Sequence, residues 1–164
     1  MYIHGGGKRS QKFFEIADQM FIVGFFIGNP RNWPFEHWIQ QSPNVVIVSV
    51  YYRLDGLGFL SSPSFTSTNT PSSLGVHNAG LLDQREALRW VQKHISAFGG
   101  DPARVTINGE SAGGSSVVFH LVARGAANER LFSSAIAQSV YRVPYLKPTE
   151  QTVRLFCIHI WSHV

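Results

Sequence analysis

The chain of 164 residues contains one cysteine, Cys157, so it cannot form a disulfide within itself. A lone thiol near the end of a chain is interpreted as a bystander and not as a nucleophile. Charged residues make up 15% of the chain and hydrophobic residues 44%, which is typical of a globular domain with much buried surface. The apolar run 20–28 is too short to cross a bilayer, which needs about 20 residues. We therefore expect one globular domain without a transmembrane segment.

Positive charge is in small excess and is spread along the chain. The formal net charge is +4, and only Lys8, Arg9 and Lys12 cluster, without interleaved aromatic residues. A nucleic-acid-binding footprint should concentrate on one element, so we predict a solvated surface and no nucleic-acid partner. The first residues lack the basic and apolar regions of a signal peptide, which leaves the compartment open.

Strand-like runs alternate with helical segments from residue 45 onward. The run 45–52 is β-branched and aromatic except at Ser49, which predicts a central parallel strand buried on both faces. Residues 78–95 predict an amphipathic helix, which the breakers at 99–102 end. The apolar face of that helix consists of Leu81, Leu88, Val91 and Ile95. Further expected elements are a strand at 105–108, a helix from Ser111 to about Val122, a strand at 134–139 and a surface loop at 61–73. This alternation indicates an α/β fold with a parallel sheet.

The most informative stretch is 105–114, in which an apolar strand enters a G-x-S-x-G pentapeptide and small residues leave it. Such a pattern predicts a nucleophile elbow, with Ser111 at the tip of a tight strand-to-helix turn. Gly109 and Gly113 flank the serine, where a β-carbon would crowd the neighbouring backbone. The stretch therefore predicts the nucleophile of a serine hydrolase.

A second motif, H-G-G-G at residues 4–7, follows the apolar pair Tyr2-Ile3. Attack on an ester carbonyl creates an oxyanion that needs preplaced N–H donors. In α/β-hydrolases one donor is the residue after the nucleophile, here Ala112, and the others come from a glycine-rich loop of this type. His4 is isolated from other ligand types, so we expect it to position the loop and not to bind a metal.

Together these stretches resemble the type-B carboxylesterase family of the α/β-hydrolase superfamily, which includes lipases and cholinesterases. The matching segments are YIHGGG at 2–7, VVIVSVYYRLDGLGFL at 45–60, NAGLLDQREALRWV at 78–91, FGGDPARVTINGESAGG at 98–114 and FSSAIAQS at 132–139. The resemblance implies a partial α/β-hydrolase fold, with a mostly parallel sheet and flanking helices. It covers residues 1–155, and the tail 156–164 has no family character. Full-length relatives are often secreted.

The resemblance also implies roles for individual residues. Ser111 is the expected nucleophile of a carboxylic ester hydrolase, and the expected oxyanion donors are Gly6, Gly7 and Ala112. Around them a buried polar network of Arg53, Asp83 and Glu110 is implied; the alternative is that Arg53 and Asp83 form a purely structural pair. The expected substrate is a small-molecule or lipid ester, with no metal and no organic cofactor.

The expected acid and histidine of the catalytic triad have no identifiable counterparts. In the family both lie far downstream of the elbow, in the order Ser, acid, His. His120 lies about nine residues into the helix of the nucleophile, some 13 Å along it at 1.5 Å per residue, and should not reach Ser111. His159 and His163 lie in the tail without family character, and Glu129 and Glu150 are expected to be solvated.

Residues 8–24 interrupt a family motif. Removing them joins Gly7 to Phe25 and restores HGGGFFIG, the form H-G-G-G-F-x-x-G of the family. The residues at both junctions can be encoded with splice-site sequences. Residues 8–24 are therefore interpreted as a non-family insert, by hypothesis a translated in-frame intron, and the tail as readthrough of another.

Two alternatives remain open. The family includes adhesion proteins that keep the fold and have lost the chemistry, so the chain could be a non-catalytic interaction module. It could also be a gene-model product that never folds stably, because a truncated parallel sheet exposes an unpaired apolar edge that favours aggregation.

Overall fold

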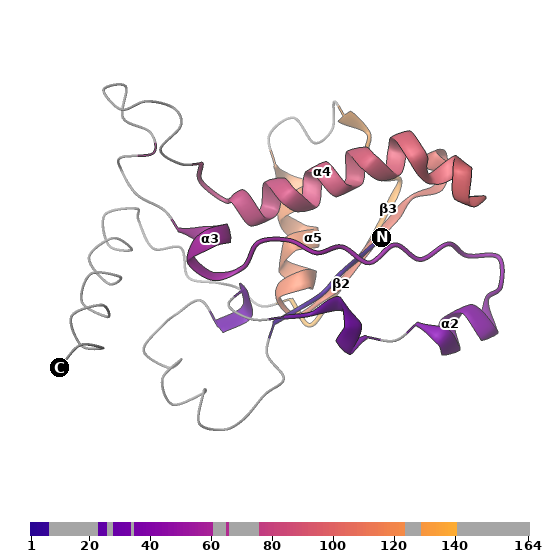
Figure 1. The fold of residues 1–164 in the computed structure, drawn as a ribbon, viewed down its shortest axis with the longest axis horizontal. Coiled ribbons are helices and arrows are strands. Elements are labelled where there is room, and N and C mark those ends of the chain that lie inside the picture. Colours follow the sequence, from indigo (N-terminus) through magenta and orange to yellow (C-terminus); the bar gives the residue numbers. More distant parts are fainter. Residues whose placement is uncertain are drawn as a thin grey trace.

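The computed structural model describes residues 1–6, 23–25, 28–33, 35–60, 65, 76–123 and 129–140. Within them a small parallel sheet has the order β1-β2-β3 (Figure 1). Its strands are β1 (Tyr2–Ile3), β2 (Thr106–Glu110) and β3 (Ser134–Gln138). Tyr2 pairs with Asn108, and Thr106 pairs with Ser134. The predicted α/β class, and strands at both of the downstream positions, are confirmed.

The run 45–52 lies beside β1, but it is not the fully buried strand that we expected. The N–H of Tyr2 donates to the carbonyl of Val48 at 2.8 Å, and the N–H of Val50 donates to the carbonyl of Tyr2 at 3.4 Å. Val45 and Val46 are 45% and 40% exposed. Among the described residues, this run pairs only with β1, through a single bridge. The expectation of burial on both faces was therefore wrong, because apolar composition does not show how many neighbouring strands a run has.

Helix α4 (Ala79–His94) confirms the helix predicted from periodicity. Of the predicted apolar face, Leu88 and Val91 are buried, as is Ile95 directly after the helix, whereas Leu81 is half-buried. A short 3-10 helix, η5 (Ile95–Phe98), follows and ends at Gly99, whose φ of 80° suits glycine. After it, η6 (Pro102–Arg104) leads into β2, so the breakers end the helix as expected.

Helix α5 (Ala112–Val122) begins directly after Ser111, also as expected. It crosses α4 in Figure 1 and packs against the sheet. Small residues at its start allow close approach, since a β-carbon on Gly114 would collide with the Gln138 carbonyl of β3. One core unites sheet and helices, and its members include Ile3, Tyr52, Leu88, Ile107 and Val117.

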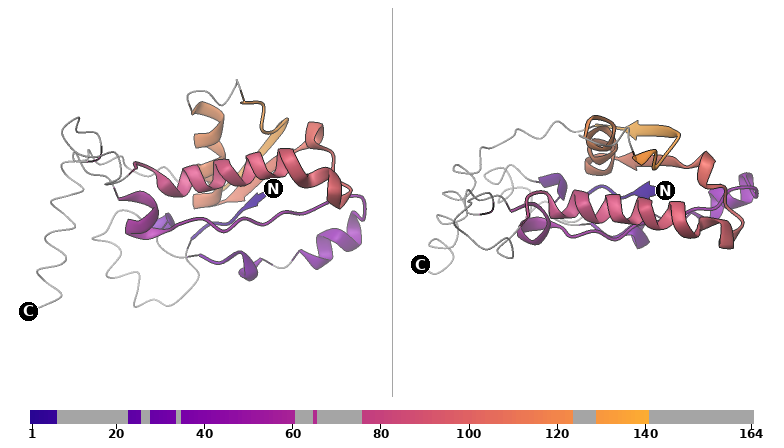
Figure 2. Two further views of the ribbon diagram at one scale, coloured as in Figure 1. Left: turned by 45° about the horizontal axis from the view of Figure 1, so that its top comes forward. Right: turned by 90° about the horizontal axis from the view of Figure 1, so that it is seen from above.

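Four shorter elements complete the described part of the chain. These are η1 (Val23–Phe25), η2 (Pro30–Asn32), α2 (Glu36–Gln41) and α3 (Asp55–Phe59). Figures 1 and 2 show α2 and α3 at opposite ends, joined by the extended segment that runs beside α4. Most of the proposed insert 8–24 and of the expected loop 61–73, together with the whole tail 156–164, lies outside the described residues.

Glu129 is not simply solvated, which corrects the expectation from the sequence. It forms ion pairs with Arg85 and Arg89 of α4, at 3.0 Å between Glu129 Oε2 and Arg89 Nε. These two arginines hold the pKa of the carboxyl below its usual range. The pairs join the segment after α5 to α4, a contact between distant parts of the chain that sequence spacing does not reveal.

Among the described residues, no helix is long and apolar enough to cross a membrane.

Candidate active site

Ser111 occupies a strained backbone position between β2 and α5. Its φ of 57° and ψ of −118° lie outside the regions that side-chain-bearing residues favour. The turn is held on both sides, since the Ser111 N–H donates to the Gln138 carbonyl at 3.0 Å and the Ser111 carbonyl accepts from the Ser115 N–H at 2.9 Å. Strain held in place by surrounding contacts is frequent at functional sites. This is the backbone conformation that the predicted elbow requires.

The flanking glycines are packed against backbone. A β-carbon on Gly109 would collide with the carbonyl of Gly113, and one on Gly113 would collide with the carbonyl of Ile3. The strand β1 and the start of α5 thus touch through main-chain atoms. The close approach explains why the pentapeptide needs glycine at both positions.

The H-G-G-G loop lies against the elbow. A β-carbon on Gly5 would be 2.5 Å from the Glu110 carbonyl and 3.1 Å from the β-carbon of Ser111. Gly6 and Ser111 line the same cavity. Ala112 is fully buried at the first position of α5, where N–H groups lack an acceptor within the helix. Of the expected donors, Gly6 and Ala112 are therefore beside Ser111, whereas Gly7 lies outside the described residues.

His4 is 1% exposed and fixes the start of this loop. Its Nδ1 is 2.9 Å from the Gly5 carbonyl, and its own carbonyl accepts a hydrogen bond from the Tyr52 hydroxyl at 2.7 Å. The imidazole stacks on the Tyr52 ring at 4.5 Å, and burial lowers the pKa of His4. A stacked and buried imidazole fits the expected positioning role.

Gly28 lies against the imidazole of His4 and the carbonyl of Gly5. A β-carbon there would be 2.5 Å from His4 Nδ1 and 2.7 Å from the Gly5 carbonyl. Phe25, three residues earlier, is buried and packs on Phe59 with ring centroids 4.5 Å apart. The two parts of the interrupted motif, separated in sequence by the proposed insert, are thus in contact at Gly28.

A cavity of about 470 Å³ opens beside Ser111. Aromatic side chains form much of its wall, and the lining residues are Tyr2, Gly6, Asn32, Trp33, Phe35, His37, Trp38, Glu110, Ser111 and Gln138. Sequence reasoning missed the segment 32–38, which matches no motif. Its density of aromatic residues shortly after the glycine-rich loop was the available signal.

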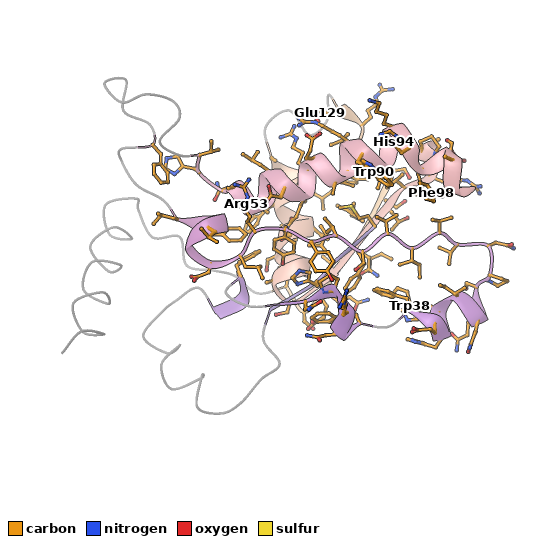
Figure 3. All side chains as sticks on the ribbon, in the orientation of Figure 1. Trp38, Arg53, Trp90, His94, Phe98 and Glu129 are labelled. Carbon is orange, nitrogen blue, oxygen red and sulfur yellow. The ribbon has the colours of Figure 1, made fainter. Side chains whose placement is uncertain are left out.

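The three groups of the expected polar network lie in different settings. Glu110 is half-buried and lines the cavity. Arg53 forms a two-pronged pair with Asp83, at 2.8 Å from Nε to Oδ2 and 2.7 Å from Nη2 to Oδ1, and this arginine lowers the pKa of Asp83. The Arg53 side chain is 56% exposed, at the start of α4 in Figure 3, and neither partner lines the cavity. The pair is therefore formed, but at the surface.

His120 is engaged elsewhere. Its Nε2 is 3.0 Å from Gln84 Oε1, and the amide of Gln84 donates to Ser116 Oγ at 3.1 Å. Burial, and to a smaller extent the charge of Arg85, lower the pKa of His120 to about 4. The expectation that this histidine does not serve Ser111 is consistent with its place between α4 and α5.

Within the described ranges, no three metal-ligating side chains gather into a site.

Comparison with known proteins decides the lineage. A model of the carboxylesterase family matches residues 1–154. The chain belongs to this family.

Individual carboxylesterases and lipases show how much of such a protein is present. The chain is 47% identical over 100 residues to carboxylesterase patB of Aspergillus clavatus, covering 61% of this chain and 17% of that protein. It is 41% identical over 133 residues to lipase 1 of Geotrichum candidum, covering 79% and 23%. The structure of a thermophilic pNB esterase superposes with a TM-score of 0.69 at 30% identity, covering 98% and 28%. The α/β-hydrolase fold is thereby confirmed, and the chain spans about a fifth of the length of the two curated relatives.

Proposed function

We propose that the chain carries the nucleophile and oxyanion groups of a carboxylic ester hydrolase, with a small-molecule or lipid ester as substrate. The observation that supports this most is the strained turn at Ser111 in contact with the H-G-G-G loop. Two independent motifs, far apart in sequence, converge on one serine at the edge of a cavity. That convergence is expected of an acyl-transfer site and not of a glycine-rich turn alone.

In the proposed reaction, Ser111 Oγ gives its proton to a base and bonds to the ester carbonyl carbon, while the carbonyl π electrons move to oxygen. The N–H groups of Gly6, Gly7 and Ala112 would donate to that oxyanion. Loss of one such donor typically costs about 3–4 kcal/mol of transition-state stabilisation. Collapse of the intermediate breaks the bond to the alcohol, which leaves with the proton, and water then releases the acid. The mechanism calls for no metal and no organic cofactor.

We also propose that these 164 residues do not include the acid and histidine of a working triad. Within the described part of the chain, no hydrogen bond joins the Ser111 hydroxyl to a histidine or a carboxylate. His4 and His120 are committed to Gly5 and Gln84. His37 lines the cavity from α2, but it precedes the serine, opposite to the chain order of the family.

The Arg53–Asp83 pair is proposed to hold the segment before α3 on α4, and to affect the site only through stability. The test is Asp83→Asn, with the labelling described next normalised to the folded fraction. Reduced stability with unchanged labelling supports the proposal. A loss of labelling in fully folded protein would instead place the pair in a network that serves the nucleophile.

The test of the function uses the whole chain and its Ser111→Ala variant. Both are incubated with a fluorophosphonate, and hydrolysis of p-nitrophenyl acetate is measured in parallel. We expect at most slow, Ser111-dependent labelling and no turnover. Rapid labelling with turnover would overturn the claim that the acid and base are lacking.

A non-catalytic interaction module is the second candidate. The observation that favours it is that β3 lies at an edge of the three-stranded sheet and each of its five residues is exposed. A soluble, folded chain that never labels at Ser111, even with an external base, would support this candidate over the esterase.

A further inference from the structure

The wall of the cavity beside Ser111 is a contiguous aromatic array. The Tyr2 ring packs edge-on to Phe35 at 5.0 Å, and Phe35 packs edge-on to Trp38 at 5.3 Å. Trp33 contacts Tyr2 with centroids 6.1 Å apart. Such edge-to-face contacts fix the rings relative to one another, and a further ring adds to the array more favourably than a flexible alkyl chain.

The size of the cavity suits a ring that is joined to an ester. An apolar cavity of about 150 Å³ is enough to hold benzene. The volume of about 470 Å³ therefore leaves space for the carbonyl group at Ser111 as well. It also falls within the usual range of ligand pockets, about 300–1,000 Å³.

The charge of the lining acts against anions. Among the described residues, Glu110 is the one side chain of the Asp, Glu, Lys and Arg types that lines this cavity. The other polar groups there are uncharged amides and hydroxyls and the imidazole of His37. A carboxylate on the ligand would meet repulsion from Glu110 in a site with low-dielectric walls, and none of the described lining residues is an arginine or lysine that would offset it.

We propose that Trp33, Phe35 and Trp38 form a subsite for the uncharged aromatic group of an ester, and that Glu110 excludes anionic groups from it. This assignment rests on the proposed function, because the subsite belongs to the cavity that Ser111, the proposed nucleophile, borders. It names a substrate class, aryl or arylalkyl esters without a carboxylate, and assigns specificity to a segment that carries no family motif.

The test measures binding without catalysis. The probes are amides that mimic the esters and are not turned over, N-benzylacetamide and N-hexylacetamide, and the protein is the full chain with Ser111→Ala. The chain has four tryptophans. An NMR spectrum of isotope-labelled indole N–H groups therefore contains few signals, and single Trp→Phe variants can assign each signal to its residue. We expect N-benzylacetamide to shift the Trp33 and Trp38 signals and to leave that of Trp90 in place. Trp90 lies on α4, against His94 and Phe98 (Figure 3).

Matched variants measure how much Trp38 contributes to binding of the probe. Trp38 and Trp90 are similarly exposed, at 39% and 45%, so Trp90→Ala is the control for Trp38→Ala. Trp38→Ala should weaken binding of N-benzylacetamide about tenfold, and Trp90→Ala should not change it. Trp38→Phe keeps a ring and should retain most of the binding, which separates loss of the subsite from loss of the fold.

A third probe, N-(4-carboxybenzyl)acetamide, tests the role of Glu110. It should bind at least about tenfold more weakly than N-benzylacetamide, and Glu110→Gln should narrow that difference. Equal binding of the hexyl and benzyl probes, or equal effects of the Trp38 and Trp90 substitutions, would overturn the proposal. If only the proposed esterase function is wrong, the benzyl probe still binds at Trp38, although Ser111 does not react in the labelling experiment. That result differs from failure of the subsite, in which the benzyl probe shows no preference for Trp38.

Discussion

Gly5 and Ser111 lie in direct contact, although one is near the N-terminus and the other follows the central strand. A β-carbon on Gly5 would come within 3.1 Å of the Ser111 β-carbon and 2.5 Å of the Glu110 carbonyl. The glycine-rich loop and the elbow are therefore mutually constrained, and each fixes the position of the other.

Gly5→Ala should consequently reduce the free energy of unfolding by about 1–3 kcal/mol, because the new methyl group must displace backbone. Gly56→Ala is the control, since a β-carbon at Gly56 in α3 meets no atom within 4 Å. That variant should be neutral or more stable by up to about 1 kcal/mol. Urea unfolding of both measures the difference, and equal stabilities would contradict the contact.

The strained backbone of Ser111 predicts a conflict between stability and function. Ser111→Gly should raise the free energy of unfolding by about 1 kcal/mol, because glycine accepts a positive φ without strain. Ser111→Ala keeps the β-carbon and should not gain this stability. If both variants unfold at the same urea concentration, the turn is not strained.

The buried His120 predicts a loss of stability in acid. Its pKa is about 4 in the folded chain, against about 6.5 for an unfolded histidine. Its contribution is complete above pH 6.5, falls as the unfolded state gains the proton, and is lost below pH 4, a change of about 3 kcal/mol. Urea unfolding between pH 7 and pH 4 tests this. His120→Gln can still donate to Gln84 and should show a correspondingly flatter dependence; parallel curves would rule out titration of His120 as the cause.

Much of the framework was predictable because it depends on local sequence. Helix α4 was predictable from the periodicity of its apolar residues and its terminal breakers, and the elbow from two glycines around Ser111. The burial predicted for the run 45–52 was wrong, because composition does not show how many neighbouring strands a run has. The ion pairs of Glu129 depend on distant segments meeting in space, so no local pattern contains them. The cluster of aromatic residues around Trp33 and Trp38 is visible in the sequence, but its place beside Ser111 also depends on distant segments meeting.

The contact between His4 and Gly28 bears on the proposed insert. Both belong to the form H-G-G-G-F-x-x-G that results when residues 8–24 are removed, and they touch in the folded chain. We predict that transcripts include a spliced form that encodes HGGGFFIG, and that a chain without residues 8–24 is at least as stable as the full chain. Sequencing of complementary DNA and urea unfolding check the two parts. Transcripts that uniformly carry the insert would rule out the splicing hypothesis.

The central claim is that a competent serine is present and its base is not. It is tested most directly by adding imidazole as an external base and following hydrolysis of p-nitrophenyl acetate by the chain and by Ser111→Ala. After subtraction of the variant, we expect no activity without imidazole and an activity that rises with imidazole concentration. Full turnover without imidazole, or none at any imidazole concentration in folded protein, would contradict the account.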